Sequence, residues 1–159
     1  MQSSIESLHL ANRYLKSADH IAYVTYPLVK DNKLIVAVLE NLSSAVTNAM
    51  DALLQHEKIN RSINTIPESF ELRHQVLASL AVKYNISPSE VGLITDLRSM
   101  VHQRKKSAME FIRKDKYILW DTSQGKIEEL TMDLMKGYLI RAKPLIIKIN
   151  GVLQNVRRF

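Results

Sequence analysis

Apolar residues recur at three- and four-residue steps along most of the chain, which is the spacing of one face of an α-helix. Between these stripes lie short polar connections such as NRSINTIPES, at residues 60–69. The stripes cover, in order, residues 5–25, 32–59, 70–84, 88–101 and 131–156. The pattern therefore predicts five substantial helices, each with one face turned toward a shared core.

Capping residues mark where two of these helices begin. Ser3 precedes the first stripe and Glu6 follows three residues later, while Ser87 and Glu90 stand in the same relation before the fourth. A serine hydroxyl at the N-cap and a carboxylate three positions on satisfy two otherwise unpaired N–H groups, an arrangement called a capping box. Helix starts are therefore predicted at these two points.

Two further local signals predict where helices end or begin. The Tyr26-Pro27 step predicts the end of the first helix, because the residue before a proline is driven out of the helical backbone region. Ser107 and Glu110 form a third capping box, which predicts a short helical turn running through Arg113.

Residues 116–130 break the helical pattern. The run YILW at 117–120 is β-prone, the following DTSQG is typical of a turn, and KIEEL can return as a partner strand. Helical periodicity resumes at Thr131 and contains Pro144, where a kink is expected. The chain is thus predicted to be a single all-α domain over 1–159, an up-and-down bundle of about five helices with a small β-hairpin or extended loop near 116–130.

Composition narrows the class of protein. The 159 residues include no cysteine, so disulfides and thiolate metal sites are excluded, as suits a reducing compartment. The start of the chain lacks a basic region followed by an apolar stretch, and the longest apolar runs are too short to cross a bilayer. We therefore expect a cytoplasmic protein with no membrane partner.

The net charge of +6 is concentrated in one part of the chain. Residues 98–116, called here the basic segment, hold seven Lys and Arg against two acidic residues, a local excess of +5. Such an excess is a candidate site for a polyanion, either nucleic acid or an acidic protein surface. The alternative is that these cations only solvate one helix face.

Candidate phosphate-binding residues are the cations of this segment: Arg98, Arg104, Lys105, Lys106, Arg113, Lys114 and Lys116. If they contact nucleic acid, Tyr117 and Trp120 beside them can stack on unpaired bases. The alternative for both aromatic residues is an apolar plug that closes one end of the bundle.

No common catalytic motif or ligand-binding loop is present. The four glycines are scattered, so phosphate-cradling loops are unsupported, and no GxSxG or HExxH sequence occurs. The five histidines show no short ligand pair with a third donor at a suitable spacing. No metal and no cofactor is therefore expected.

Arg98 and His102 lie four residues apart and share one helix face. Such a pair suits RNA cleavage in principle, since an imidazole can accept the 2′-hydroxyl proton while a guanidinium stabilises the charge that develops on the phosphate. The alternative is that both residues only contact phosphate. Arg98 and His102 are thus candidate catalytic residues as well as binding residues.

Two stretches resemble the HEPN domains (higher eukaryotes and prokaryotes nucleotide-binding). The Leu and Ala positions of LHLANRYLKSADHIAYV and LIVAVLENLSSAVTNAMDALL are similar to the first two helices of that family, and LRSMVHQ is similar to its Arg-polar…His motif. In LRSMVHQ, Arg98 is followed by the polar Ser99, and three residues separate Arg98 from His102, fewer than in the family.

The resemblance implies a helical fold, metal-independent RNA cleavage by Arg98 and His102, and a homodimer formed through the helix that begins at Pro88. Three functions follow from the sequence. The first is an RNA-binding helical domain that uses the basic segment, the second is an HEPN-type endoribonuclease, and the third is an interaction module for an acidic protein partner.

Overall fold

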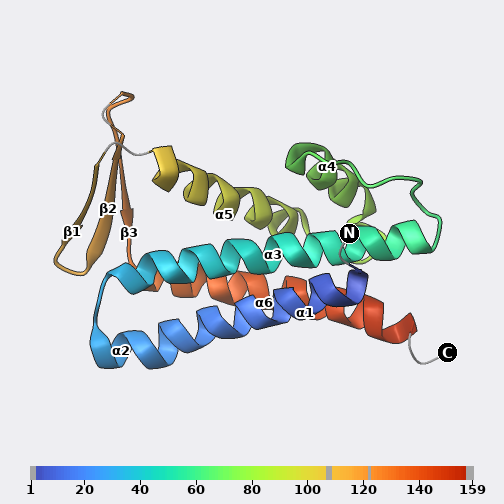
Figure 1. Cartoon of the computed structure of the whole chain (residues 1–159), viewed down its shortest axis with the longest axis horizontal. Helices are drawn as coiled ribbons and strands as arrows, with labels where there is room; N and C mark the ends of the chain where they lie inside the picture. Colours follow the sequence, from blue (N-terminus) through green and yellow to red (C-terminus); the bar gives the residue numbers. More distant parts are fainter. Residues whose placement is uncertain (1–2, 107–108, 122, 157–159) are drawn as a thin grey trace.

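The computed structural model describes residues 3–106, 109–121 and 123–156, and it has the expected helical fold with a small β-sheet (Figure 1). In chain order the elements are α1 (Ser4–His20), the π-helical turn η1 (Ile21–Thr25), α2 (Tyr26–Val29), α3 (Lys33–Ile59), α4 (Phe70–Leu80), α5 (Pro88–Lys106), β1 (Met109–Arg113), β2 (Lys116–Asp121), β3 (Lys126–Leu130) and α6 (Met132–Val156).

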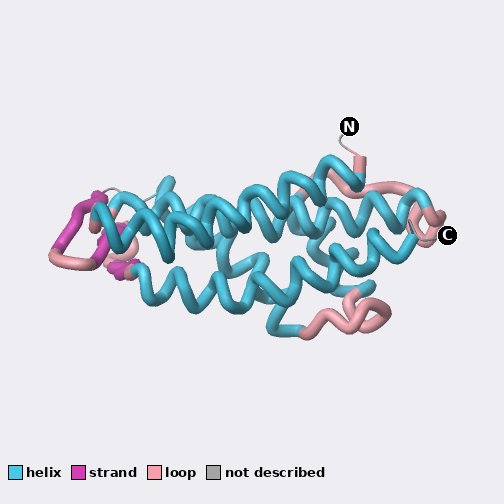
Figure 2. Tube along the Cα trace, turned by 90° about the horizontal axis from the view of Figure 1, so that it is seen from below, coloured by secondary structure: helices cyan, strands magenta, loops and turns pink. Residues whose placement is uncertain are grey.

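The long helices α1, α3, α5 and α6 lie side by side and alternate in direction along the chain, as an up-and-down bundle requires (Figures 1 and 2). Helix α3 packs against α1, α5 and α6. The short α4 packs on α3 and α5 at the end of the bundle where both chain termini lie, and the sheet lies at the opposite end.

Helix α3 supplies the centre of the core. Its fully buried apolar residues occupy most of its circumference: Ile35, Val38, Leu39, Leu42, Ala45, Val46, Ala49, Met50, Ala52, Leu53 and Leu54. Ala11, Ala18 and Ala22 of α1 and η1 are also fully buried, and their small side chains let the first helix approach α3 closely. Each large apolar side chain buried in this way contributes about 1.5–3 kcal/mol to stability.

Both predicted capping boxes are present. The Glu6 N–H donates to Ser3 Oγ at 3.2 Å, and the Ser3 N–H donates to Glu6 Oε2 at 3.3 Å. At α5, the Glu90 N–H donates to Ser87 Oγ at 3.1 Å and the Ser87 N–H donates to Glu90 Oε1 at 3.0 Å. These helix starts were therefore correctly predicted from short sequence signals.

The first helical stretch does not end at Tyr26-Pro27, contrary to the prediction. The Tyr26 N–H donates to the carbonyl of Ile21, five residues back, which is the bond of a π-helical turn. Pro27 then falls in the first turn of α2, where a missing N–H removes no helical bond. The helix ends at Val29 because Lys30 adopts a left-handed conformation, with φ of 55°.

The helical turn predicted to run through Arg113 is wrong, since residues 109–113 form strand β1; Ser107 and Ala108 lie outside the described residues. Phe111 and Ile112 favour extended backbone. They lie opposite Ile118 and Tyr117 in an antiparallel ladder with β2. Pairing with the neighbouring strand β2 therefore overrides the local capping signal.

The predicted hairpin forms between β2 and β3 and is extended by β1 into a three-stranded antiparallel sheet of order β1-β2-β3. A two-residue turn, Lys114-Asp115, joins β1 to β2, and Lys114 has a positive φ of 58°. Asn32, just before α3, donates a side-chain hydrogen bond from Nδ2 to the Lys114 carbonyl. The Tyr26 hydroxyl donates in turn to Asn32 Oδ1 at 3.0 Å, so this asparagine links the first helices to the sheet.

Alternation along β2 sends neighbouring side chains to opposite faces of the sheet. Tyr117 and Leu119 face the bundle and join the core together with Leu130 of β3, in agreement with the apolar-plug alternative for Tyr117. Trp120 points the other way, is 37% exposed and is not part of the core, so that alternative is wrong for Trp120.

Pro144 lies within α6, as expected, and α6 continues as one helix from Met132 to Val156. Its core-facing side carries Met135, Leu139, Leu145 and Ile149 among others, all fully buried. Neither α6 nor any other helix in the described parts of the chain is long and apolar enough to cross a membrane.

Candidate nucleic-acid interface

A cleft of about 600 Å³ opens between α4, the second half of α5 and the turn that joins β2 to β3. Helix α5 contributes Arg98, His102 and Lys106, which lie at successive four-residue steps and so share one helix face. The first residue of β3, Lys126, lines the cleft from the opposite side. The structure thus places the two candidate catalytic residues and one predicted phosphate-binding lysine on the same cleft.

Arg98 is held in the cleft by an aromatic ring. The central carbon of its guanidinium lies 4.0 Å from the centroid of the Phe70 ring, within the range of a cation–π interaction. Among the described residues no carboxylate pairs with it. The charge of Arg98 is therefore fixed in position without being neutralised, which is the condition an anion-binding group requires.

Phe70 is positioned in turn by α4. Its ring is buried and stacks on that of His74, one helical turn later, at a centroid distance of 5.9 Å and an interplanar angle of 22°. His74 Nε2 lies 2.8 Å from the carbonyl oxygen of Val91, and because a carbonyl can only accept, Nε2 carries the proton. The side chain of His74 is thus tied to α5, and with it the ring that supports Arg98.

The acidic side chains of the cleft are Glu71 and Asp121. The Asp121 Oδ1 accepts hydrogen bonds from the Ser123 hydroxyl at 2.6 Å and from the Ser123 N–H at 3.0 Å. These bonds from Ser123 hold the pKa of the Asp121 carboxyl below its ordinary value. Asp121 therefore shapes the β2–β3 turn, and it also lies opposite Lys126 in the ladder.

Arg104, another predicted phosphate-binding residue, is engaged elsewhere. Its Nη1 lies 2.8 Å from Glu40 Oε1 on α3, and its Nε lies 3.5 Å from Glu110 Oε1 on β1. Glu110 also accepts a 2.6 Å hydrogen bond from the Tyr117 hydroxyl. Burial, together with that bond, raises the pKa of the Tyr117 phenol. Arg104 therefore connects three elements of the fold and does not face the cleft.

The remaining cations of the basic segment lie apart from the cleft lining. Lys116 pairs with Glu129 across β2 and β3 at 3.0 Å. Arg113 and Lys114 are exposed at the β1–β2 turn, and Lys105 is exposed near the end of α5. The seven predicted binding residues therefore do not form one continuous face; Arg98 and Lys106 belong to the cleft, and the other five do not line it.

Among the cleft residues that sequence reasoning missed are three that lie outside the basic segment and support or extend its charge: Phe70, His74 and Lys126. Phe70 and His74 are four apart, a spacing that already indicates a shared helix face. Their contact with Arg98 is tertiary and has no local signal. Within the described ranges, no three His, Cys, Asp or Glu side chains are grouped as metal ligands.

Comparison with known proteins gives no relative: no family model, no curated protein and no solved structure matches the chain. The similarity to HEPN domains stays a prediction from the residues of three helices. Function must therefore be inferred from the geometry of the cleft and the chemistry of its side chains.

Proposed function

We propose that the chain is a nucleic-acid-binding domain, with RNA as its ligand, and that the cleft between α4, α5 and the β2–β3 turn receives phosphate groups. The observation that supports this most is Arg98, whose guanidinium is held against Phe70 and has no carboxylate partner among the described residues. A guanidinium of this kind can bind two phosphate oxygens at once.

Lys106 and Lys126 extend the positive charge to both sides of the cleft. In the part of the chain that the structure describes, neither lysine forms a direct ion pair, although Lys126 lies opposite Asp121 and its charge helps to lower the pKa of Asp121. A cation that is already paired binds an incoming phosphate more weakly, because its ion pair with the carboxylate must first be broken. The binding set is therefore Arg98, Lys106 and Lys126, with His102 between the first two, and it excludes Arg104 and Lys116.

The test is fluorescence anisotropy with a labelled 12-nucleotide single-stranded RNA, in EDTA, over a series of salt concentrations. Three phosphate contacts predict a slope of log affinity against log salt of about −2 from the cleft alone. The double variant Lys106→Gln with Lys126→Gln is expected to reduce the slope by about 1.4. Its matched control is Lys16→Gln, because Lys16 is an exposed lysine on α1, outside the cleft.

Two results would overturn the proposal: affinity that does not depend on salt, or a double variant that binds RNA as the wild type does. Copurification of the chain with one stoichiometric protein, free of nucleic acid, would instead favour an interaction module for an acidic partner.

A second candidate function is metal-independent RNA cleavage, favoured by the presence of Arg98 and His102 on one wall of the cleft. In this reaction His102 would take the proton of a 2′-hydroxyl, whose oxygen attacks the adjacent phosphorus while the bond to the 5′ oxygen breaks. Arg98 would stabilise the negative charge that develops on the phosphate oxygens, and the leaving oxygen would take up a proton.

Cleavage separates this candidate from simple binding. A nuclease predicts shortened RNA in EDTA, and His102→Gln should abolish cleavage while leaving the affinity for RNA within about twofold. Intact RNA after prolonged incubation would remove the candidate and leave the binding domain. The homodimer implied by the HEPN resemblance is part of the same candidate, and light scattering after size exclusion would show a mass of twice 18.2 kDa.

A further inference from the structure

The sheet has an apolar face that points away from the bundle. Because side chains opposite each other in a ladder share a face, Phe111, Ile118, Trp120 and Ile127 all lie on this side, called here the outward sheet face. Phe111 is 40% exposed, Trp120 is 37% exposed and Ile127 is 60% exposed. Two aromatic rings on neighbouring strands are thus open to solvent.

Ile118 forms the floor of this face. It is only 5% exposed although it lies outside the hydrophobic core of the bundle. Phe111 stands directly across the ladder from it, and Trp120 stands two residues further along the same strand. Both rings are therefore neighbours of one aliphatic residue, Phe111 across the ladder and Trp120 along the strand, and both are fixed to a hydrogen-bonded sheet instead of a loop.

Two cations border the outward sheet face at its β1–β2 end. Arg113 and Lys114 are exposed at the β1–β2 turn, and neither has an ion-pair partner among the described residues. At the other end, the Trp120–Ile127 pair is followed by the Asp121–Lys126 pair, whose side chains alternate to the bundle side of the sheet and line the cleft. Successive residues of a strand are about 3.4 Å apart, so the cleft and the outward sheet face meet around this end of the sheet.

This combination of rings and cations fits one kind of ligand better than others. Aromatic side chains stack on the faces of unpaired bases, and lysine or arginine beside them neutralises the phosphates that connect those bases. In a duplex the bases are stacked on one another, so their faces are covered. A protein partner would cover the apolar residues but would not require the unpaired cations at the β1–β2 end.

We infer that the outward sheet face stacks unpaired bases, with Trp120 and Phe111 as the stacking residues, and that the ligand is a single-stranded nucleic acid that continues from the cleft around the β2–β3 end of the sheet onto this face. This inference rests on the proposed function, because the cleft supplies the neighbouring phosphate contacts. Beyond that function, it specifies that the nucleic acid is single-stranded and that the protein contacts it through a second surface.

Trp120 provides a direct probe, because it is the only tryptophan in the chain. Titration with a 12-nucleotide oligouridine is expected to quench its fluorescence, and quenching should saturate at the same concentration as the anisotropy of the labelled oligomer. A 12-base-pair RNA duplex is expected to quench little. Trp120→Leu should weaken binding of the single strand by roughly 5- to 150-fold, while Trp120→Phe should retain most of the affinity.

The matched control is Ile140→Ala on α6, which removes an exposed apolar side chain from another surface and should leave affinity unchanged. Salt-dependent binding of the oligomer without quenching, with Trp120→Leu binding as tightly as the wild type, would overturn this inference and leave the cleft as the site. Equal affinity for single strand and duplex would also overturn it. Absence of any binding would remove the proposed function together with it.

Discussion

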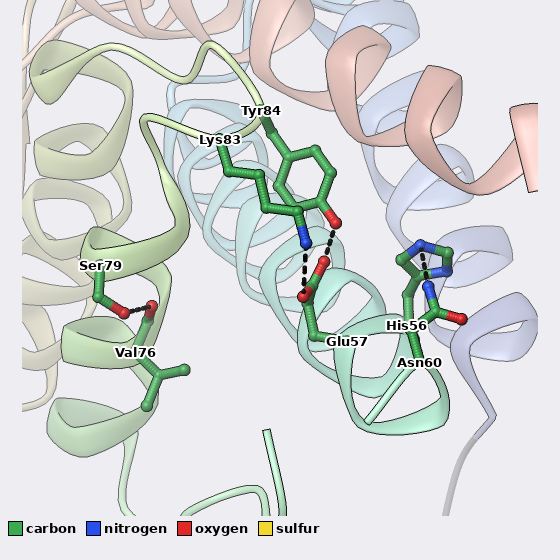
Figure 3. Close-up of polar contacts among 7 residues, drawn as sticks. All are labelled: His56, Glu57, Asn60, Val76, Ser79, Lys83 and Tyr84. Carbon is green, nitrogen blue, oxygen red and sulfur yellow. Dashed lines mark hydrogen bonds and ion pairs between the residues drawn. The ribbon is translucent and has the colours of Figure 1, made fainter. Parts of the chain in front are cut away.

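The hydroxyl of Tyr84 donates a hydrogen bond to Oε1 of Glu57, a residue near the end of α3 whose side chain is fully buried (Figure 3). The second oxygen of Glu57 lies 3.3 Å from Nζ of Lys83. A buried carboxylate without such partners would be strongly unfavourable. The two bonds therefore stabilise this charge and attach the segment before α5 to α3.

Replacing Tyr84 with phenylalanine is expected to lower the free energy of unfolding by about 1.5–3 kcal/mol, because it removes a hydrogen bond to a buried charged group. Urea denaturation followed by circular dichroism measures the change. Tyr138→Phe is the control, since no hydrogen-bond partner of the Tyr138 hydroxyl occurs among the described residues, and a change within about 0.5 kcal/mol is expected there. Equal stability of the Tyr84 and Tyr138 variants would show that the buried bond contributes nothing.

The ionisation of Glu90 is expected to make the stability of the fold depend on pH in the acid range. Burial disfavours its charged form, but hydrogen bonds from Lys148, at 2.5 Å, and from Ser87 outweigh burial, so the pKa of Glu90 lies below its ordinary value of 4.5. A carboxyl whose pKa is lower in the folded state stabilises the protein above the unfolded pKa. That contribution is lost as the pH falls through the folded pKa.

The wild type is therefore expected to lose stability more steeply than Glu90→Gln between about pH 5 and pH 3. At pH 7 the variant should be less stable by about 1–3 kcal/mol, since it leaves Lys148 without its charged partner. Glu129→Gln serves as the control, because its pair with Lys116 is exposed and contributes less than about 1 kcal/mol. Parallel pH profiles for wild type and Glu90→Gln would contradict the prediction.

Asn32 controls the attachment of the sheet. Asn32→Asp keeps the acceptor for the Tyr26 hydroxyl but removes the N–H donor that bonds the Lys114 carbonyl. Hydrogen exchange in residues 109–121 is therefore expected to accelerate by roughly fivefold or more, which corresponds to about 1 kcal/mol of lost protection, while α1 and α6 stay unchanged.

Asn48→Asp is the matched control for this exchange experiment, because the Asn48 side chain donates within α3, to the Ser44 carbonyl. Faster exchange throughout the chain in Asn32→Asp would mean that the bond supports the whole fold and not the sheet in particular.

Arg104→Gln distinguishes a structural cation from a binding one. Loss of its pairs with Glu40 and Glu110 is expected to reduce stability by about 1 kcal/mol, because both partners are partly exposed. Its affinity for RNA should stay within about twofold of wild type at physiological salt, where charges beyond about 8 Å are largely screened. A loss of affinity as large as that of Lys106→Gln would return Arg104 to the binding set.

The helices were predictable because their signals are local. Ser87 and Glu90 are three residues apart and mark the start of α5 without reference to the rest of the chain. The same reasoning failed at Ser107 and Glu110, where an equally good local signal competes with a ladder to β2. Helix propensity contributes only tenths of a kcal/mol per residue, so the hydrogen bonds to a partner strand can outweigh it.

The cleft was only half predictable for a related reason. Arg98 and His102 share a face by spacing alone, and the sequence placed them together correctly. Phe70 and Lys126 are each 24 residues or more from His102 along the chain, and only the packing of α4 and the sheet against α5 brings them near it. The ion pair of Arg104 with Glu40 also has no local sequence signal. The sequence therefore provided no reason to separate Arg104 from the other cations of the basic segment.

Helix α3 connects the two sides of the cleft. Asn32, just before its first turn, bonds the sheet, and Glu57 near its end holds the segment that leads into α5. Its 27 residues span about 40 Å. A ligand seated between α4 and the β2–β3 turn would join these elements a second time and would bind only the folded chain. By mass action its binding energy then adds to the stability of the fold, so a ligand at one hundred times its Kd should raise that stability by about 2.7 kcal/mol. A rise in melting temperature can therefore identify the natural ligand among unlabelled candidates.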